Sequence, residues 1–292
     1  MERIAKRGAR ARIAVTAAAA AVAGTVWGVA TLASPAHGPG DGHDHQNVSR
    51  QKDSPGGNSP GGDSPGGGAQ DPADAAGRPG AGDAKPGGVP DTIAHASEAG
   101  GDAVNITIDD GPDPTWTPKV LEVLRKHGVK ATFCMIGPQA KAHPGVVKQV
   151  VADGNRLCDH TMDHDIGMAK KAVEYQKQQI LDAKKLIEDA AGGGAKVEYY
   201  RAPGGAFTPE SRALAAAAGM RPLGWNVDTK DFKKPGTAAI VNAVKQELRS
   251  GPTVLFHDGG GNRAQTVEAL DEVLSWLEEQ GRPTGFPVRT AP

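Results

Sequence analysis

The stretch VNITIDDGPDPTWTPKVLEVLRKHGVKATFCMIG, residues 104–137, decides the fold class. Its first five residues are rich in β-branched side chains, which favour a strand. Thr117 and Pro118 supply an N-cap and a first-turn proline, and Gly128 is typical of a helix C-terminus. A second strand is predicted in KATFCMIG, residues 130–137. The stretch therefore indicates one strand–helix–strand unit.

The same alternation continues to the end of the chain. Further strands are predicted in RLCDHT (156–161), VEYYRAP (197–203), RPLGWNV (221–227), TVLFHD (253–258) and FPVRT (286–290). Helices are predicted between them, over residues 144–154, 172–192, 208–219, 237–251 and 265–281. Alternating strands and helices imply a parallel sheet with helices outside. The number of units favours a distorted (β/α) barrel of about seven parallel strands, with a doubly wound open sheet as the alternative.

The first hundred residues differ in composition from the rest. A basic start and an Ala-rich apolar run, closed by Ser34-Pro35-Ala36, predict a signal peptide over residues 1–36, or an uncleaved membrane anchor. Either segment would send the remainder out of the cytoplasm, as a secreted or cell-envelope protein. Residues 37–101 repeat Ser, Pro and Gly without apolar periodicity, so a disordered linker is expected, of a length suited to a cell wall.

Residues 102–292 are long enough for one domain with a good core. The formal net charge of the whole chain is −1 and this part has no basic run, so nucleic acid is not an expected partner. Membrane contact is expected only through an uncleaved N-terminal segment, and the protein is expected to be a monomer. Both cysteines, Cys134 and Cys158, lie here. In an exported chain such a pair predicts a disulfide, the alternative being two buried thiols.

Polar side chains are predicted at the carboxyl ends of the strands. In a parallel barrel those ends share one rim, which is where active sites are built. The residues concerned are Asp109, Asp110, His160, Arg201, Asp228 and His257.

Two of the motifs indicate metal-assisted chemistry. His160 and His164 stand four apart, and with a carboxylate on the same rim they make a candidate His₂-carboxylate site. Without one, the pair would be ordinary surface residues. Asp109 and Asp110 could divide the work, one binding a cation and the other moving a proton, although DDGP alone is also a common turn.

The remaining motifs suggest charge stabilisation and acid catalysis. Arg201, in RAPGG, could hold a carboxylate charged and oriented, and the backbone N–H groups around Gly204 could face a developing oxyanion. Asp228 and His257 together suggest an Asp-oriented histidine whose imidazolium protonates a leaving group. Each of these residues alone has a structural alternative.

Five motifs in this order resemble one family. TIDDGP (107–112), HTMDH (160–164), RAPGG (201–205), DTKDF (228–232) behind Trp225, and LFH (255–257) resemble the signature of the polysaccharide deacetylases. This is the NodB-type domain of carbohydrate esterase family 4, and the resemblance covers residues 102–288.

The resemblance implies a role for each matching residue. Asp110, His160 and His164 would hold one divalent ion, with zinc as the usual metal and cobalt or another ion as alternatives. Asp109 would be the general base, oriented by Arg201, and Gly204 would supply the oxyanion N–H. His257 would be the general acid, tuned by Asp228.

The implied reaction is metal-dependent hydrolytic N-deacetylation of N-acetylglucosamine polysaccharides, such as peptidoglycan or chitin oligomers, with release of acetate. Alternatives are O-deacetylation of acetylated xylan at the same site and a non-catalytic carbohydrate-binding relic.

Three positions depart from the family pattern. Ile108 replaces Phe, Gly204 stands where many members have Tyr, and Phe232 replaces Trp. Phe232 and Trp225 are expected to line the substrate groove. Every charged residue of the motifs is present, so an active enzyme is expected, and the departures bear on substrate preference.

Overall fold

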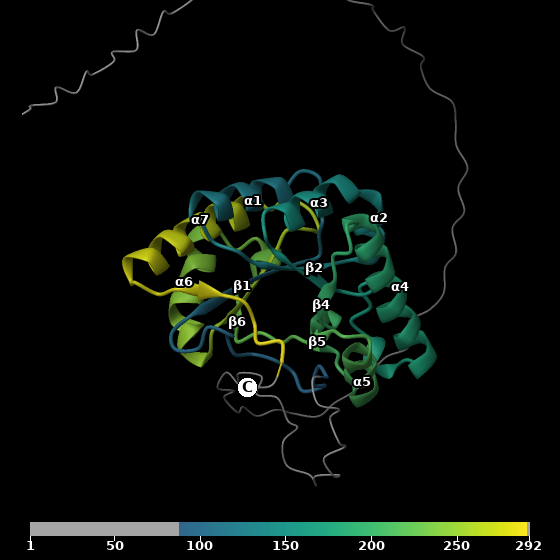
Figure 1. Cartoon of the computed structure of the whole chain (residues 1–292). Helices are drawn as coiled ribbons and strands as arrows, with labels where there is room; N and C mark the ends of the chain where they lie inside the picture. Colours follow the sequence, from purple (N-terminus) through teal and green to yellow (C-terminus); the bar gives the residue numbers. More distant parts are fainter. Residues whose placement is uncertain (1–87, 291–292) are drawn as a thin grey trace, which may run out of the picture. The chain divides into compact units, whose positions relative to one another are not determined.

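The computed structural model describes residues 88–290. The predicted signal or anchor and most of the predicted linker lie outside the described residues. Figure 1 shows the described part as a curled sheet with helices packed around its outside. Within this part no helix combines the length and the apolar character that a membrane span needs.

All the strands of the sheet are parallel. The order across the sheet is β5-β4-β3-β2-β1-β7-β6, and β8 pairs with the beginning of β1. This confirms the predicted distorted barrel built from strand–helix units. The strands are β1 (Val104–Asp109), β2 (Thr132–Met135), β3 (Arg156–Asp159), β4 (Val197–Tyr200), β5 (Arg221–Pro222), β6 (Val227–Asp228), β7 (Thr253–His257) and β8 (Thr284–Gly285).

The helices connect successive strands on the outer face of the sheet (Figure 1). They are α1 (Thr117–Lys126), α2 (Gly137–Ala142), α3 (Pro144–Ala152), α4 (Val173–Ala191), α5 (Pro209–Ala217), α6 (Thr237–Glu247) and α7 (Ala264–Glu279). Thr208 caps α5, because its hydroxyl accepts the Ser211 N–H and the Ser211 hydroxyl accepts the Thr208 N–H. Of the α-helices within residues 88–290, the short α2 is the one without a counterpart in the sequence analysis.

One predicted strand proves to be two. Residues 221–227 were expected to form a single strand, but β5 and β6 lie on opposite edges of the sheet. The chain from Pro222 to Val227 spans at most about 17 Å. A flat sheet would separate the two edges by about 29 Å, so the sheet has to curl. The barrel therefore stays open between β5 and β6, and the connection crosses the opening.

Residues 88–101, the described segment before β1, fill this opening. Ala94 is buried, its N–H donates to the Pro222 carbonyl, and its own carbonyl accepts the Gly224 N–H. The Thr253 hydroxyl donates to the His95 carbonyl on the other side. The predicted domain start at residue 102 is therefore wrong. Residues before it belong to the fold, although no periodic pattern marks them, because their backbone groups complete the barrel.

The strand at the C-terminus is also corrected. The predicted strand over 286–290 is replaced by β8, with an isolated antiparallel bridge between Ser97 and Pro287 beyond it. Pro287 has no N–H to donate to a continued ladder. The Phe286 carbonyl instead accepts the Glu98 N–H.

Successive side chains of a strand point to opposite faces of the sheet, and this divides the buried residues into two groups. On β1, Val104, Ile106 and Ile108 join the core under the helices. On β2 and β3, Cys134 and Cys158 lie in a separate cluster with Tyr199, Leu223 and Ala94, away from that core. The two cysteines are register partners and form a disulfide, as predicted.

Candidate active site

The loop after β1 presents two adjacent carboxylates. Asp109 ends the strand on the face opposite to Ile106 and Ile108, and Asp110 adopts a left-handed backbone with φ of 75°. A Cβ on Gly111 would collide with the Asp258 carboxyl group, so only glycine fits the turn. The turn therefore carries both carboxylates to the rim.

The two histidines come from the loop after β3. Thr161 and His164 have positive φ of 69° and 50°, and the Asp159 carboxylate accepts the Thr161 N–H at 2.7 Å. Gln179 of α4 accepts the N–H groups of Met162 and Asp163. This bent and anchored loop brings the His160 and His164 rings to a centroid distance of 4.9 Å.

Asp110, His160 and His164 converge on one point, as predicted. Asp110 Oδ1 lies 3.5 Å from His160 Nε2 and 3.2 Å from His164 Nε2. One ligand atom from each residue lies within 4.8 Å of the others. Asp110 Oδ1 is buried and no hydrogen bond satisfies it. A buried unsatisfied carboxylate oxygen beside two imidazole nitrogens fits a divalent cation with nitrogen and oxygen ligands.

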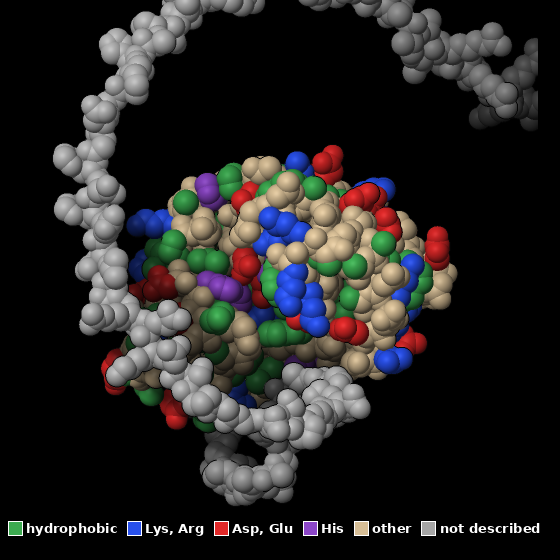
Figure 2. Space-filling model, turned by 180° about the vertical axis from the view of Figure 1, so that it is seen from behind, with side chains coloured by type: hydrophobic (Ala, Val, Ile, Leu, Met, Phe, Trp, Pro, Cys, Tyr) green, Lys and Arg blue, Asp and Glu red, His purple; other side chains and the backbone are tan. Residues whose placement is uncertain are grey.

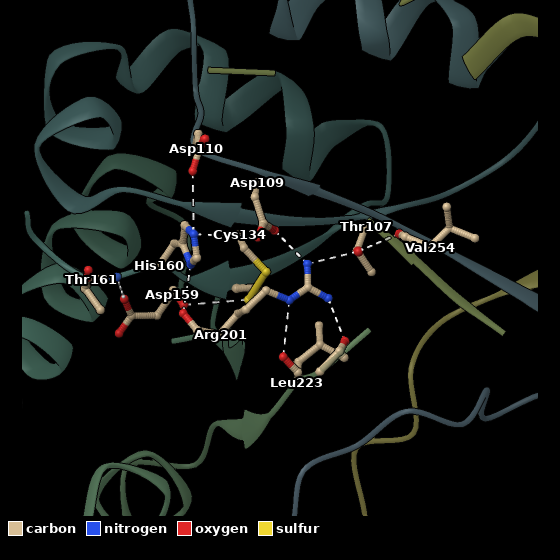
Figure 3. Close-up of a disulfide and its surroundings, with 12 residues drawn as sticks. Thr107, Asp109, Asp110, Cys134, Asp159, His160, Thr161, Arg201, Leu223 and Val254 are labelled. Atoms are coloured by element: carbon tan, nitrogen blue, oxygen red, sulfur yellow. Dashed lines mark hydrogen bonds and ion pairs between the residues drawn. A yellow bond between two sulfur atoms is a disulfide. The ribbon is translucent and has the colours of Figure 1, made fainter. Parts of the chain in front are cut away.

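The protonation states also suit a metal. Burial acts to raise the pKa of Asp110, but contact with His164 and the charges of His160 and His257 outweigh it and hold the pKa well below its usual range. Burial lowers the pKa of His160, against the nearby carboxylates. His160 Nδ1–H donates to the Arg201 carbonyl at 2.8 Å, which leaves Nε2 facing Asp110 (Figure 3).

Arg201 orients Asp109 from inside the barrel. The side chain is 0% exposed, and its Nη1 donates to Asp109 Oδ1 at 2.7 Å and to the Thr107 hydroxyl at 3.0 Å. Its Nε and Nη2 donate to the carbonyls of Leu223 and Gly224 (Figure 3). Asp109 Oδ2 faces His160 Nε2 at 3.6 Å. One oxygen of Asp109 is thus fixed by a buried cation while the other faces the metal cluster.

His257 ends β7, as predicted, but its partner is Asp231. Asp231 Oδ1 lies 2.6 Å from His257 Nδ1, and Oδ2 accepts the His257 N–H and the Thr266 hydroxyl. The predicted pairing with Asp228 is wrong. Asp228 ends β6 half-exposed, and its carboxylate accepts the Lys230 N–H at 3.0 Å. The short turn after β6 places Asp231, the second aspartate of DTKD, against His257, and Asp228 does not contact the ring.

Asp231 changes the chemistry of His257. Burial lowers the pKa of His257, but the hydrogen bond to Asp231 and the charges of Asp231, Asp109 and Asp110 raise it to about 9. The imidazole is therefore a cation at neutral pH, with Nδ1–H donated to Asp231 and Nε2–H left to act as an acid.

The predicted groove residues lie on the same rim. The Phe232 side chain is exposed and its ring centroid lies 5.3 Å from that of His257. Trp225 is half-buried with the Arg201 guanidinium 5.6 Å from its ring, and Gly204 is exposed with φ of 59°. Sequence analysis missed Ile166, which is 70% exposed and packs against the position where a side chain on residue 204 would begin. An exposed isoleucine two residues after His164 is the signal that could have identified it.

Similarity to known proteins agrees with this geometry. The family described as Polysaccharide deacetylase matches residues 96–223. A peptidoglycan-N-acetylglucosamine deacetylase of Bacillus cereus is 40% identical over 180 residues, covering 61% of this chain and 83% of that protein. The chain belongs to the polysaccharide deacetylase family. A chitooligosaccharide deacetylase of Sinorhizobium fredii is 37% identical over 208 residues, which cover 67% of this chain and 93% of that relative.

A solved structure shows that the family fold occurs without activity. It is a carbohydrate esterase family 4 pseudoenzyme from Bacillus anthracis, with a TM-score of 0.59 and 30% identity. The match covers 63% of each chain. Activity in a polysaccharide deacetylase therefore has to be argued from the side chains of the site, not from the fold.

Proposed function

We propose that this polysaccharide deacetylase is a metal-dependent hydrolase that removes the N-acetyl group from N-acetylglucosamine residues of a polysaccharide and releases acetate. One observation carries the proposal. An arginine-held carboxylate, Asp109, and a cationic histidine, His257, accompany the cluster of Asp110, His160 and His164. A base and an acid beside one cation are what amide hydrolysis requires.

Each residue then has one task. Asp110, His160 and His164 would hold the cation, which when bound polarises the acetyl carbonyl and makes water more acidic. Asp109 Oδ2 accepts a proton from the water that attacks the carbonyl carbon, while the hydrogen bond from Arg201 to Oδ1 holds the carboxylate in place. The exposed backbone of Gly204 would offer an N–H to the developing oxyanion.

His257 completes the reaction at the leaving group. When the carbon–nitrogen bond breaks, the departing amine needs a proton, because an amide anion is a poor leaving group. His257 Nε2–H supplies this proton while Asp231 holds the opposite face of the ring. The products are acetate and a free amino sugar, and the proton taken by Asp109 balances the one given by His257.

The named activities of the relatives guide the choice of substrate. One relative is a peptidoglycan-N-acetylglucosamine deacetylase and another is a chitooligosaccharide deacetylase. We favour peptidoglycan, since residues 1–36 have the pattern of an export signal and the Ser-, Pro- and Gly-rich residues between them and the folded domain have the composition of a wall-length linker. The protein would then act outside the cytoplasm, secreted or anchored.

Acetate release by the full-length protein tests the proposal. Peptidoglycan, chitooligosaccharides and acetylated xylan are each supplied with untreated enzyme, with chelator-treated enzyme, and with treated enzyme given zinc or cobalt. We expect release from the two N-acetylglucosamine polymers, loss with chelator and recovery with metal. Release from xylan alone would instead identify an O-deacetylase. Retention of glycan without release from any substrate would identify a binding protein.

A further inference from the structure

A short loop after β6 places lysines beside the catalytic histidine. The loop consists of Lys230, Asp231, Phe232, Lys233 and Lys234, and we name it the lysine loop. Asp231 fixes the loop because it is hydrogen-bonded to both the ring and the backbone of His257. The Phe232 ring packs on His257 and Lys233 Nζ lies 5.8 Å from the Phe232 ring.

The same loop approaches the metal cluster through the glycines after β7. Lys234 Nζ lies 3.8 Å from the position of a Cβ on Gly261. The corresponding position on the neighbouring Gly260 lies 3.9 Å from Asp110 Oδ2. Lys234 and Asp110 thus approach neighbouring glycines of the same stretch, and the Arg263 guanidinium lies beside Gly260 as well. Histidine, acidic and basic side chains lie close together on the face shown in Figure 2.

The charges of the three lysines are not compensated. Among residues 88–290, Lys230, Lys233 and Lys234 are exposed and take part in no ion pair, whereas Lys126, Lys184 and Lys185 each contact a carboxylate. Of the two nearby aspartates, Asp231 is buried against His257 and the Asp228 carboxylate accepts a backbone N–H. Three exposed lysines beside one half-exposed carboxylate, Asp228, thus leave a local excess of positive charge in a chain whose formal net charge is −1.

We infer that the lysine loop is a subsite for carboxylate groups carried by the glycan next to the acetamide that is cut. Exposed ammonium groups attract carboxylates, and a neutral polymer of N-acetylglucosamine offers none. Peptidoglycan carries carboxylates on its stem peptides, and on those lactyl groups that bear no peptide. The inference rests on the proposed function and narrows its substrate to an anionic glycan, with Phe232 offering apolar surface to the sugar and the lysines binding the charge.

Two triple variants of the full-length protein test this inference. The first is Lys230→Gln, Lys233→Gln and Lys234→Gln, which removes the charge of the loop and leaves Asp231 and Phe232 in place. The matched control is Lys141→Gln, Lys148→Gln and Lys177→Gln, which removes the same charge from exposed positions on α2, α3 and α4. The substrates are peptidoglycan strands, the same strands with their carboxylates converted to methylamides, and neutral chitooligosaccharides.

We expect the loop variant to lose about tenfold in kcat/KM on unmodified strands at low ionic strength, mainly through KM, since each exposed ion pair contributes modestly. Its kcat/KM on amidated strands and chitooligosaccharides should stay within about twofold of the parent value. The control variant should match the parent on all three substrates. Salt should reduce the parent's preference for unmodified strands, because the screening length falls from about 30 Å at 0.01 M to about 10 Å at 0.1 M.

Binding of the same strands, measured by calorimetry, separates this inference from the proposed function. Charge-dependent binding that the loop variant loses would support the subsite even if no acetate were released, and the proposed function alone would then fail. Equal losses on unmodified and amidated strands would overturn the inference, because shape and not charge would be responsible. No loss, or the same loss in the control variant, would overturn it as well.

Discussion

Asp109 and Asp110 are adjacent in the chain and yet have different surroundings. Asp109 ends a strand and shares one oxygen with the buried guanidinium of Arg201. Asp110 follows in a left-handed conformation and meets two imidazoles instead. One carboxylate is therefore suited to moving a proton and the other to binding a cation. The difference arises because the backbone changes from an extended strand at Asp109 to a left-handed conformation at Asp110.

The variant Asp109→Asn tests the proposed base. The amide keeps the size of the side chain but cannot accept a proton, while Asp110, His160 and His164 are untouched. We expect bound zinc to remain and kcat to fall by about a hundredfold to ten-thousandfold. Metal content and acetate release, measured on the same preparation, check both parts. Near-normal turnover would remove Asp109 from the role of base.

The variant Asp231→Asn tests the partner of His257. The carboxylate raises the pKa of His257, so its loss should lower that pKa. Because His257 is required as the protonated acid, activity should then be lost at a lower pH on the alkaline side of the profile. The pH dependence of kcat/KM for acetate release is the measurement. Asp228→Asn is the matched control and should leave the alkaline side of the pH profile unchanged. A shift in the control variant alone would instead support the pairing of His257 with Asp228.

At the scale of elements, the alternation of strands and helices in the sequence predicts much of the site. The strand–helix pattern implies parallel strands, and parallel strands place Asp109, His160, Arg201 and His257 on one rim, as the structure confirms. The pairing of His257 could not be predicted, because DTKD offers two carboxylates and only the turn over residues 231–233 selects between them. The division of residues 221–227 into β5 and β6 could not be predicted either, because it depends on closure of the barrel and not on local periodicity.

The turn between β1 and α1 yields a prediction of its own. In Gly111→Ala, the new methyl group would collide with the Asp258 carboxyl group, which is buried and also contacts Thr117. The turn must shift, so we expect zinc affinity to fall by about tenfold to a hundredfold, as when other supporting groups of metal sites are removed. Competition with a chromophoric chelator measures this affinity.

Gly145→Ala, in α3 with open space around it, is the control and should bind zinc normally. Equal affinities in the two variants would contradict the steric account.

At the scale of the whole molecule, closure of the barrel depends on residues that sequence analysis assigned to the linker. Ala94 lies between Pro222 and Gly224 on one edge, and the next residue accepts a hydrogen bond from Thr253 near the other. Farther along, both carboxylate oxygens of Glu98 accept from the guanidinium of Arg156. No hydrophobic pattern reveals this role, because the stabilisation comes mostly from backbone and ionic contacts to distant segments.

Two shortened chains measure what the segment contributes. A chain that begins at residue 102 leaves the backbone groups of Pro222 and Gly224 without partners and exposes the interior around Leu223, whereas one that begins at residue 88 keeps every described contact. We expect the shorter chain to unfold about 5–15 °C lower, since each kcal/mol lost lowers Tm by about 2–4 °C in a domain of this size. Thermal unfolding followed by circular dichroism compares the two. Because Arg201 donates to the Leu223 and Gly224 carbonyls, the shorter chain should also lose activity before it unfolds. Identical Tm values would show that the barrel closes without the segment.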